Sequence, residues 1–257
     1  MIERAKRWIC SVGFFRRLAQ DAATLDFGRD FIAEWAAAGA AASSTPSPFV
    51  VLDIGCGEGR DLAAVGARLA PRPTTLWGID NSQHHVETLG RSGFRTIQSD
   101  IERDRLPFDD ASIDLVIANQ ILEHLKEIFW VLGELSRVLK PGGTLIVGVP
   151  NLAAFHNRFL LLFGDQPVCL RTLGPHVRGF TRKDLTAFLQ SNNIFEVLDC
   201  KGSHVYPFPI AAGRWLARRR PGLASAIFLR VRRTGSPSNF LSILDGIRLE
   251  TNFHRGP

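Results

Sequence analysis

The most constraining feature of this chain is a short stretch in which an apolar strand pattern runs directly into three alternating glycines. Residues 50–59 read VVLDIGCGEG, and a helix-compatible segment, RDLAAVGARLA, follows at once. A buried run rich in β-branched residues predicts a strand, and glycines in the turn let the backbone adopt positive φ angles and approach a ligand closely. The stretch therefore predicts a parallel strand, a tight ligand-binding turn and a helix N-terminus, in that order.

The acid at the end of this strand indicates which ligand the turn accepts. The dinucleotide fingerprint is G-x-G-x-x-G, and a Walker loop requires Gly-Lys-Ser/Thr. Here the pattern is D-x-G-x-G-x-G, and the carboxylate of Asp53 would repel a pyrophosphate. A second apolar strand ends in Asp80, which suits hydrogen bonds to a ribose diol. Each acid alone also fits a helix cap or a loop; together they favour a nucleoside that carries a cationic amino-acid group.

These motifs, together with later ones, resemble the class I S-adenosylmethionine-dependent methyltransferases. The segments that carry the resemblance are VLDIGCGEG, GID at 78–80, SDIERDRLPFDDASIDLVIANQILEHL at 99–125 and LKPGGTLIVGVPN at 139–151. The resemblance covers residues 49–200 and implies an enzyme that uses S-adenosyl-L-methionine and releases S-adenosyl-L-homocysteine. It implies that the methionine portion contacts Asp53, Gly55, Cys56, Gly57 and Gly59, the ribose contacts Asp80, the adenine contacts Asp100 and Ile101, and the sulfonium end lies near Asn119 and Gln120. Asn81 is also expected to contact the cofactor.

The alternation of apolar segments predicts an α/β, Rossmann-like fold. Strands are expected at 49–54, 75–80, 94–98, 113–118, 143–149, 195–200 and 226–233, and helices at 60–70, 82–91, 124–139, 182–191 and 210–219. Such alternation gives a mostly parallel sheet with helices on both faces. The resemblance implies seven strands in the order 3-2-1-4-5-7-6, with the last strand antiparallel.

The chain is expected to have three parts. Residues 1–48 form an N-terminal helical cap and linker, with helices over 2–20 and from about 27 to 38. Residues 49–233 form the methyltransferase domain, with an insert at 151–180, and residues 234–257 form a mobile tail. The helix over 2–20 would cover the cofactor or, because it is amphipathic and basic, lie on a membrane surface.

The insert supplies most candidates for handling the methyl acceptor. It is too long for a simple connection, and such segments usually carry function. Within GPHVRGFT at 174–181, His176 could act as a base or orient the acceptor, and Arg178 could bind an anionic acceptor group. Alternatively, both residues only pin the loop. His124 in LEHL is a second candidate base, and Asn151 and His156 are expected to line the acceptor pocket.

No metal site is predicted from the sequence. Members of the family that methylate catechol-like or quinol oxygens hold a divalent cation with acids and a histidine just after the fourth strand. That pattern requires an acid three residues before Glu123, where this chain has Gln120.

Charge is distributed unevenly along the chain. The net charge is +6, of which residues 1–20 carry +4 and residues 201–257 carry +8, so the remainder is acidic. A basic edge favours an anionic partner: an acidic, phosphorylated or lipid-linked acceptor, or a membrane surface. Nucleic acid is not expected, because no basic run is interleaved with aromatic residues for base stacking. Four cysteines without a CxxC pair and the lack of a membrane-length apolar run favour a cytoplasmic protein, with peripheral contact at the inner membrane face as an addition.

The sequence thus favours an enzyme that methylates a small or carrier-linked metabolite, at a hydroxyl oxygen because histidines are available to take a proton. The alternatives are a non-catalytic scaffold that binds S-adenosylmethionine, and a biosynthetic methyltransferase that acts on nitrogen or carbon.

Overall fold

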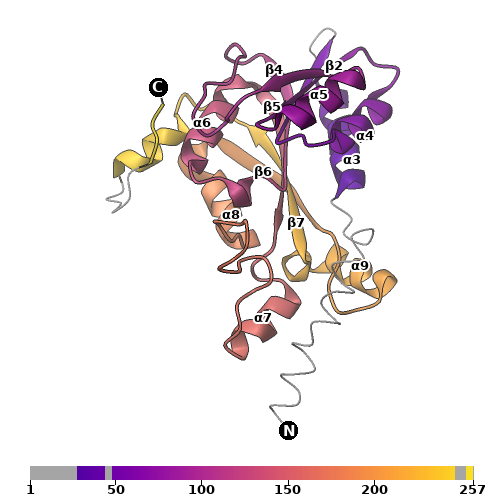
Figure 1. Cartoon of the computed structure of the whole chain (residues 1–257), viewed down its shortest axis with the longest axis vertical. Coiled ribbons are helices and arrows are strands. Elements are labelled where there is room, and N and C mark those ends of the chain that lie inside the picture. Colours follow the sequence, from indigo (N-terminus) through magenta and orange to yellow (C-terminus); the bar gives the residue numbers. More distant parts are fainter. Residues whose placement is uncertain (1–27, 44–47, 247–252, 257) are drawn as a thin grey trace.

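The computed structural model describes residues 28–43, 48–246 and 253–256, which centre on a seven-stranded sheet (Figure 1). The strands are β1 (Phe49–Ile54), β2 (Thr74–Asp80), β3 (Arg95–Gln98), β4 (Ile113–Asn119), β5 (Leu139–Pro150), β6 (Phe195–Gly202) and β7 (Ala226–Arg233). Their order is β3-β2-β1-β4-β5-β7-β6, and β7 runs antiparallel to both neighbours. This confirms the predicted fold. The helix predicted over residues 2–20 lies outside the described residues.

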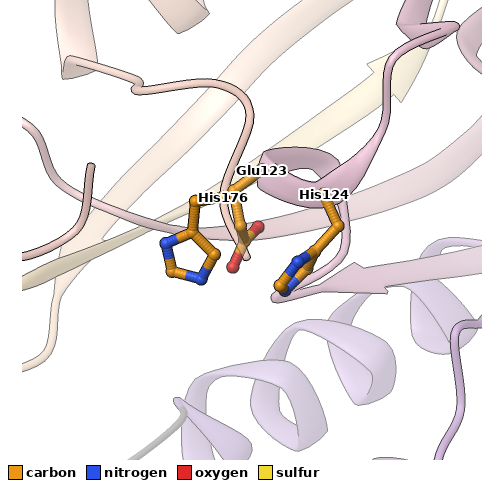
Figure 2. A group of neighbouring side chains, drawn as sticks. All are labelled: Glu123, His124 and His176. Carbon is orange, nitrogen blue, oxygen red and sulfur yellow. The ribbon is translucent and has the colours of Figure 1, made fainter. Parts of the chain in front are cut away.

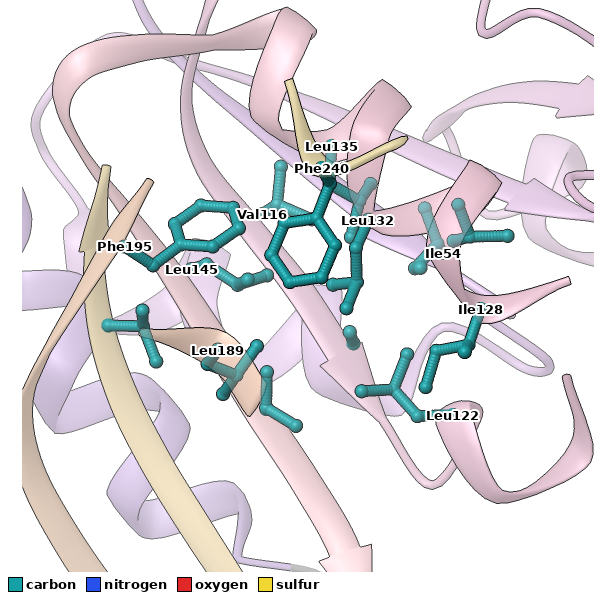
Figure 3. Packing of buried hydrophobic residues seen from close by; sticks show 14 of the residues in the cluster. Ile54, Val116, Leu122, Ile128, Leu132, Leu135, Leu145, Leu189, Phe195 and Phe240 are labelled. Atoms are coloured by element: carbon teal, nitrogen blue, oxygen red, sulfur yellow. The ribbon is translucent and has the colours of Figure 1, made fainter. Parts of the chain in front are cut away.

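Side chains that alternate along the central strands build two cores, one on each face of the sheet. Val51 and Leu115 pack under α3 (Arg29–Ala42), α4 (Arg60–Leu69) and α5 (Gln83–Arg91). Their neighbours Leu52 and Val116 pack on the opposite face under α6 (Ile128–Val138) and α8 (Arg182–Leu189) (Figure 3). Because both faces are buried, these strands read as continuous apolar runs, and the carboxyl ends of β1, β2 and β4 meet at one edge.

The helix after β4 begins later than predicted. A 3₁₀ turn, η1 (Leu122–His124), comes first, and α6 starts only at Ile128. The backbone between η1 and α6 is not helical, and its N–H groups at Lys126 and Glu127 donate hydrogen bonds to the carboxylate of Glu102. The turn therefore stays separate from α6, at the carboxyl edge of the sheet.

The insert contains a helix that the sequence did not predict, α7 (Phe155–Leu162). Its N-cap residue is Ala154, which has no side chain that can cap a helix, so the usual signal of a helix start is missing. The two ends of the insert lie side by side, since the N–H of Leu152 donates to the carbonyl of Phe180 at 2.8 Å. The insert is thus a closed loop that leaves and rejoins the domain at one place beyond β5.

Helix α9 (Ile210–Arg219) lies beside the insert at the lower end of Figure 1. Phe155 of α7 contacts Phe208, just before α9, with ring centroids 5.6 Å apart. A small separate core beneath them includes Val205, Ala217 and Ala224. The two helices therefore form one lobe beyond the sheet.

The segment after β7, predicted as a mobile tail, contains a packed turn, η4 (Phe240–Gly246). Phe240 is fully buried, with its ring 5.1 Å from that of Phe188 and 6.0 Å from that of Phe195. One large aromatic residue anchors a segment whose polar composition gave no sign of packing.

Candidate functional site

The glycine turn after β1 has the conformation that its sequence predicts. Gly55, Gly57 and Gly59 have φ angles of +66°, +50° and +74°. A Cβ on Gly59 would lie 2.1 Å from a methyl group of Leu89, so only glycine fits there. Gly57, in contrast, faces open space, with no atom within 4 Å of where its Cβ would be. The backbone at Gly57 is therefore free to meet a ligand closely.

Cys56 borders this turn only through its backbone. Its N–H donates to the carbonyl of Ile79 at 3.0 Å, which ties the turn to β2. Its side chain is buried in the core under α3 and α4. Burial, followed by the charges of Asp53 and Asp80, raises the pKa of the thiol to about 12, so Cys56 remains protonated and is not a nucleophile.

Carboxylates from three elements surround the turn. Asp53 at the end of β1 is 3 % exposed, and its pKa lies well above the usual range because it is buried and because Asp61 and Asp80 are close. Burial also raises the pKa of Asp61, against the hydrogen bond from Asn119 and the charge of Arg29. Such a cluster lowers its electrostatic cost by binding a cation. These residues therefore fit the cationic methionine portion of S-adenosylmethionine.

Sequence analysis missed Asp61. The only signal was its place in the first turn of α4, directly after the glycines. The amide of Asn119 donates to one of its carboxylate oxygens at 2.7 Å, and Nε of Arg29 lies 3.1 Å from the other. These contacts bring Asn119 to the mouth of the turn, where the resemblance implies the sulfonium end.

Asp80 joins the turn to the start of α5. Its carboxylate accepts hydrogen bonds from the N–H groups of Gly57 and Ser82, each at 2.9 Å, and lies 3.2 Å from Nδ1 of His85. Carboxylate oxygens each have more than one acceptor site, so these bonds leave capacity for a ribose hydroxyl. Asp80 thus supports the loop as well as facing the expected ribose.

The residues predicted at the adenine end continue along the same edge. The carbonyl of Asn81 accepts a hydrogen bond from Gln98, and the N–H of Ser99 donates to the carbonyl of Asp80. Asp100 is exposed, and Ile101 packs partly buried against the core under α6. This arrangement leaves the Asp100 side chain accessible to a ligand.

Gln120 occupies a strained position between the donor and acceptor sides. Its φ angle is +56°, which is uncommon for a residue other than glycine, and its N–H donates to the carbonyl of Gly148 at 2.7 Å. Its side-chain nitrogen is buried without a hydrogen-bond partner. A strained residue with an unpaired buried donor is typical of a ligand-binding position.

Three ionisable side chains converge just beyond Gln120 (Figure 2). Glu123 and His124 come from η1, and His176 comes from the insert. The two imidazole rings meet edge to face with centroids 4.7 Å apart, and the Glu123 carboxylate lies between them in Figure 2. The sequence proposed both histidines separately but did not predict that they meet, and it missed Glu123 as a site residue.

Glu123 is the least ordinary member of this group. The residue is 1 % exposed, and neither carboxylate oxygen has a hydrogen-bond partner. Burial raises its pKa to about 7. Burial also lowers the pKa of His124, an effect that the neighbouring His176 adds to and the carbonyl of Pro175 opposes. The group therefore combines unsatisfied hydrogen-bonding capacity with perturbed pKa values, as functional sites do.

The hydrogen bonds of Arg178 favour the structural role over the anion-binding role, the two options that the sequence left open. Its Nε donates to the carbonyl of Leu125 at 3.0 Å and its Nη2 to that of Lys126 at 2.7 Å. The guanidinium is thus occupied in fastening the insert to the chain after η1. Since the N–H groups of Val177 and Arg178 also donate to the carbonyl of Glu123, the pinning role is the one that the structure supports.

Asn151 and His156 are also held by structural contacts. Asn151 is fully buried, and its amide nitrogen donates to the carbonyls of Gly222 and Ala224 at 3.0 and 2.8 Å. His156 packs against Tyr206, and burial lowers its pKa to about 4. Asn151 therefore anchors the insert instead of lining a pocket, because its hydrogen-bonding groups are used within the protein.

None of the helices in the described parts of the chain is long and apolar enough to cross a membrane. An open pocket of about 530 Å³ lies at the lobe of α7 and α9. Its lining includes four arginines: Arg158, Arg182, Arg219 and Arg220.

Comparison with known proteins agrees with this geometry. The family described as "Methyltransferase domain" matches residues 52–147. A probable S-adenosylmethionine-dependent methyltransferase of Mycolicibacterium smegmatis is 34% identical over 158 residues, which cover 59% of this chain and 54% of that protein. A malonyl-[acyl-carrier protein] O-methyltransferase of a Methylovorus species is 36% identical over 109 residues, which cover 39% of this chain and 36% of that one. The chain thus spans about half or less of the length of these relatives.

Among solved structures, the [4+2]-cyclase SpnF has the same fold. Its TM-score is 0.54 at 20% identity, and the match covers 79% of this chain and 81% of the cyclase. The glycine turn and its carboxylates lie within the matched region. The chain therefore carries a class I S-adenosylmethionine-dependent methyltransferase domain.

Proposed function

We propose that this protein transfers a methyl group from S-adenosylmethionine to a hydroxyl oxygen of a small or carrier-linked metabolite and releases S-adenosylhomocysteine. One observation carries the proposal: the acid-lined glycine turn and the Glu123–His124–His176 group lie on either side of the Asn119–Gln120 strand end. The donor and the acceptor would therefore meet at the end of β4.

The donor side is suited to a cation. Three carboxylates lie close together at the turn, those of Asp53, Asp61 and Asp80. They would repel a pyrophosphate. The methionine portion of S-adenosylmethionine carries an ammonium and a sulfonium, which such a site stabilises. The open face of Gly57 gives the ligand access to the backbone.

The acceptor side supplies groups that can handle a hydroxyl. Methyl transfer is an in-line displacement, so positioning provides much of the catalysis, and a hydroxyl acceptor must also lose its proton. Nδ1 of His176 lies 2.8 Å from the carbonyl of Cys169, so it carries the ring proton and Nε2 carries the lone pair. His176 is therefore the residue that we place at the acceptor hydroxyl, as base or as orienting group, with His124 beside it.

The main alternative is a non-catalytic scaffold that binds S-adenosylmethionine. The fold alone does not establish methyl transfer, since a structural neighbour is named for a cyclisation. The buried, unpartnered carboxylate of Glu123 beside two histidines favours a catalytic site, because a scaffold would gain nothing from that cost. Methylation at nitrogen or carbon is the second alternative, and the available imidazoles favour oxygen over it.

The acceptor or its carrier is proposed to be anionic. The pocket at the lobe of α7 and α9 has four arginines and no acidic residue in its lining. Helices α7 and α9, which each contribute arginines to this pocket, also carry exposed apolar side chains, including Leu161, Leu162 and Trp215. Arginines next to exposed apolar residues suit a phosphorylated or lipid-linked acceptor presented at a membrane surface. We therefore propose a cytoplasmic protein with peripheral contact at the inner membrane face.

Asp80→Asn should weaken binding of S-adenosylhomocysteine by about 1.5–3 kcal/mol, the value of a hydrogen bond to a charged group. The substitution removes the charge that faces the ribose while nearly preserving shape. Calorimetric titration measures the change, and Glu87→Gln on the exposed face of α5 is the matched control for loss of one charge. Unchanged affinity in the Asp80 variant would show that the ribose does not bind at the end of β2.

His176→Ala should leave the affinity for S-adenosylhomocysteine unchanged and lower turnover by about 10²–10⁴-fold, the range for loss of a positioned proton-transfer group. Release of S-adenosylhomocysteine across a panel of hydroxylated anionic acceptors gives the readout. His84→Ala, which removes an exposed histidine of α5, should retain turnover. Full activity of the His176 variant would leave that histidine with a purely structural role.

Arg219→Glu combined with Arg220→Glu should reduce binding to vesicles that contain phosphatidylglycerol by at least about tenfold, since each arginine near an anionic surface contributes about 1 kcal/mol. Co-sedimentation measures binding, with pure phosphatidylcholine vesicles as the uncharged reference. Arg103→Glu combined with Arg105→Glu makes the same charge change at another surface. Equal loss in both double variants would mean that only net charge matters, and that no docking surface exists at α9.

A further inference from the structure

We infer that Glu123, His124 and His176 together bind a divalent transition-metal ion. One donor atom from each of the three lies within 4.8 Å of the other two (Figure 2). The inference deepens the proposed function, since the ion would sit where the acceptor hydroxyl is placed, but ion binding itself can be measured without any acceptor.

Both histidines are oriented as metal ligands usually are. Nδ1 of His176 lies 2.8 Å from the carbonyl of Cys169, and Nδ1 of His124 lies 3.3 Å from the carbonyl of Pro175. Each carbonyl fixes the ring proton on Nδ1 and leaves a lone pair on Nε2. A metal-bound histidine commonly donates its other N–H to a backbone carbonyl in this way.

The carboxylate provides the second, independent observation. Glu123 is 1 % exposed, and both of its oxygens lack a hydrogen-bond partner. A buried carboxylate without partners is costly, so such groups are normally paired or coordinate a metal. The imidazoles of His124 and His176 lie beside it, and a shared cation would satisfy all three side chains at once.

The scaffold holds the ligand-bearing segments in register. The N–H groups of Val177 and Arg178 donate to the carbonyl of Glu123 at 2.9 and 3.2 Å. The guanidinium of Arg178 donates to the carbonyls of Leu125 and Lys126 on the far side of the same turn. Arg178 is thus a positioning residue, which keeps His176 within reach of Glu123 and His124.

The donor set indicates which ions fit. Two imidazoles and one carboxylate suit Zn²⁺, Co²⁺, Mn²⁺ or Fe²⁺, whereas Mg²⁺ and Ca²⁺ prefer oxygen ligands alone. Three protein ligands leave coordination positions open. The acceptor class is therefore a hydroxyl compound whose oxygen can ligate the ion.

The ion would change how the acceptor loses its proton. An acceptor hydroxyl bound to the ion would have a lowered pKa and would release its proton to solvent. His176, whose Nε2 lone pair would bind the ion, would then orient the acceptor through the ion and would not take the proton itself. An electron pair on the oxygen then forms the new bond to the methyl carbon while the bond from that carbon to sulfur breaks. The products are the methyl ether and neutral S-adenosylhomocysteine, and no oxidant or reductant is needed.

The test uses tag-free, chelator-treated protein titrated with Co²⁺, whose visible absorption reports nitrogen ligation, followed by competition with Zn²⁺. One equivalent of Co²⁺ should bind. Glu123→Gln and His176→Ala should each weaken binding at least about tenfold, a lower bound since loss of an outer-shell partner alone costs 10–100-fold. His84→Ala should bind as the unaltered protein does. Titration of each variant with S-adenosylhomocysteine verifies that the donor site is folded.

Two results would overturn the inference: no Co²⁺ binding by folded protein, or binding that Glu123→Gln and His176→Ala leave unchanged, which would place the ion elsewhere. Methylation that continues undiminished in excess chelator would show that the ion takes no part in the reaction. The proposed methyltransferase function would then still stand. Stoichiometric binding lost in both variants, together with failure to methylate any acceptor, would support the metal site and count against the proposed function.

Discussion

The arrangement of this site depends on the carboxylate of Asp80, which joins the ends of two parallel strands. It accepts hydrogen bonds from Gly57 in the turn after β1 and from Ser82 at the start of α5. The turn that it supports contains three glycines with positive φ, a conformation that glycine alone adopts without strain. Because the same turn brings Asp53 and Asp61 toward Asp80, the interaction also brings three acidic side chains together at the proposed donor site.

The insert completes the site from the opposite side. Asn151 binds the N-terminal end of the insert to the chain before β7, and Arg178 binds the C-terminal end to the chain after η1. Between these attachments the insert supplies His176, which meets Glu123 beside the end of β4. In the proposed reaction, a rigid sheet would therefore position the donor, while an anchored loop would position the groups for the acceptor, as is common for enzymes whose functional residues lie on loops over a fixed scaffold.

The sequence predicted the sheet and the conformation of the glycine turn well, because both depend on local patterns. The apolar runs, the glycine turn and the acids at strand ends lie within a few residues of one another, and the strand order followed from the family that they resemble. The proposed acceptor side depends on contacts between residues about fifty positions apart in the sequence, such as His124 and His176. No local sequence pattern encodes such contacts. Arg178 and Asn151 show the same limit: their residue types suggested ligand binding, but backbone carbonyls that only the fold brings near them use their donors.

The central claim is that the acid-lined turn binds S-adenosylmethionine, and calorimetric titration of the purified protein tests it most directly. S-adenosylmethionine and S-adenosylhomocysteine should each bind with one-to-one stoichiometry, and NADH should show no heat of binding, because its pyrophosphate would face Asp53. Binding of NADH, or absence of binding by both adenosyl ligands to folded protein, would contradict the account.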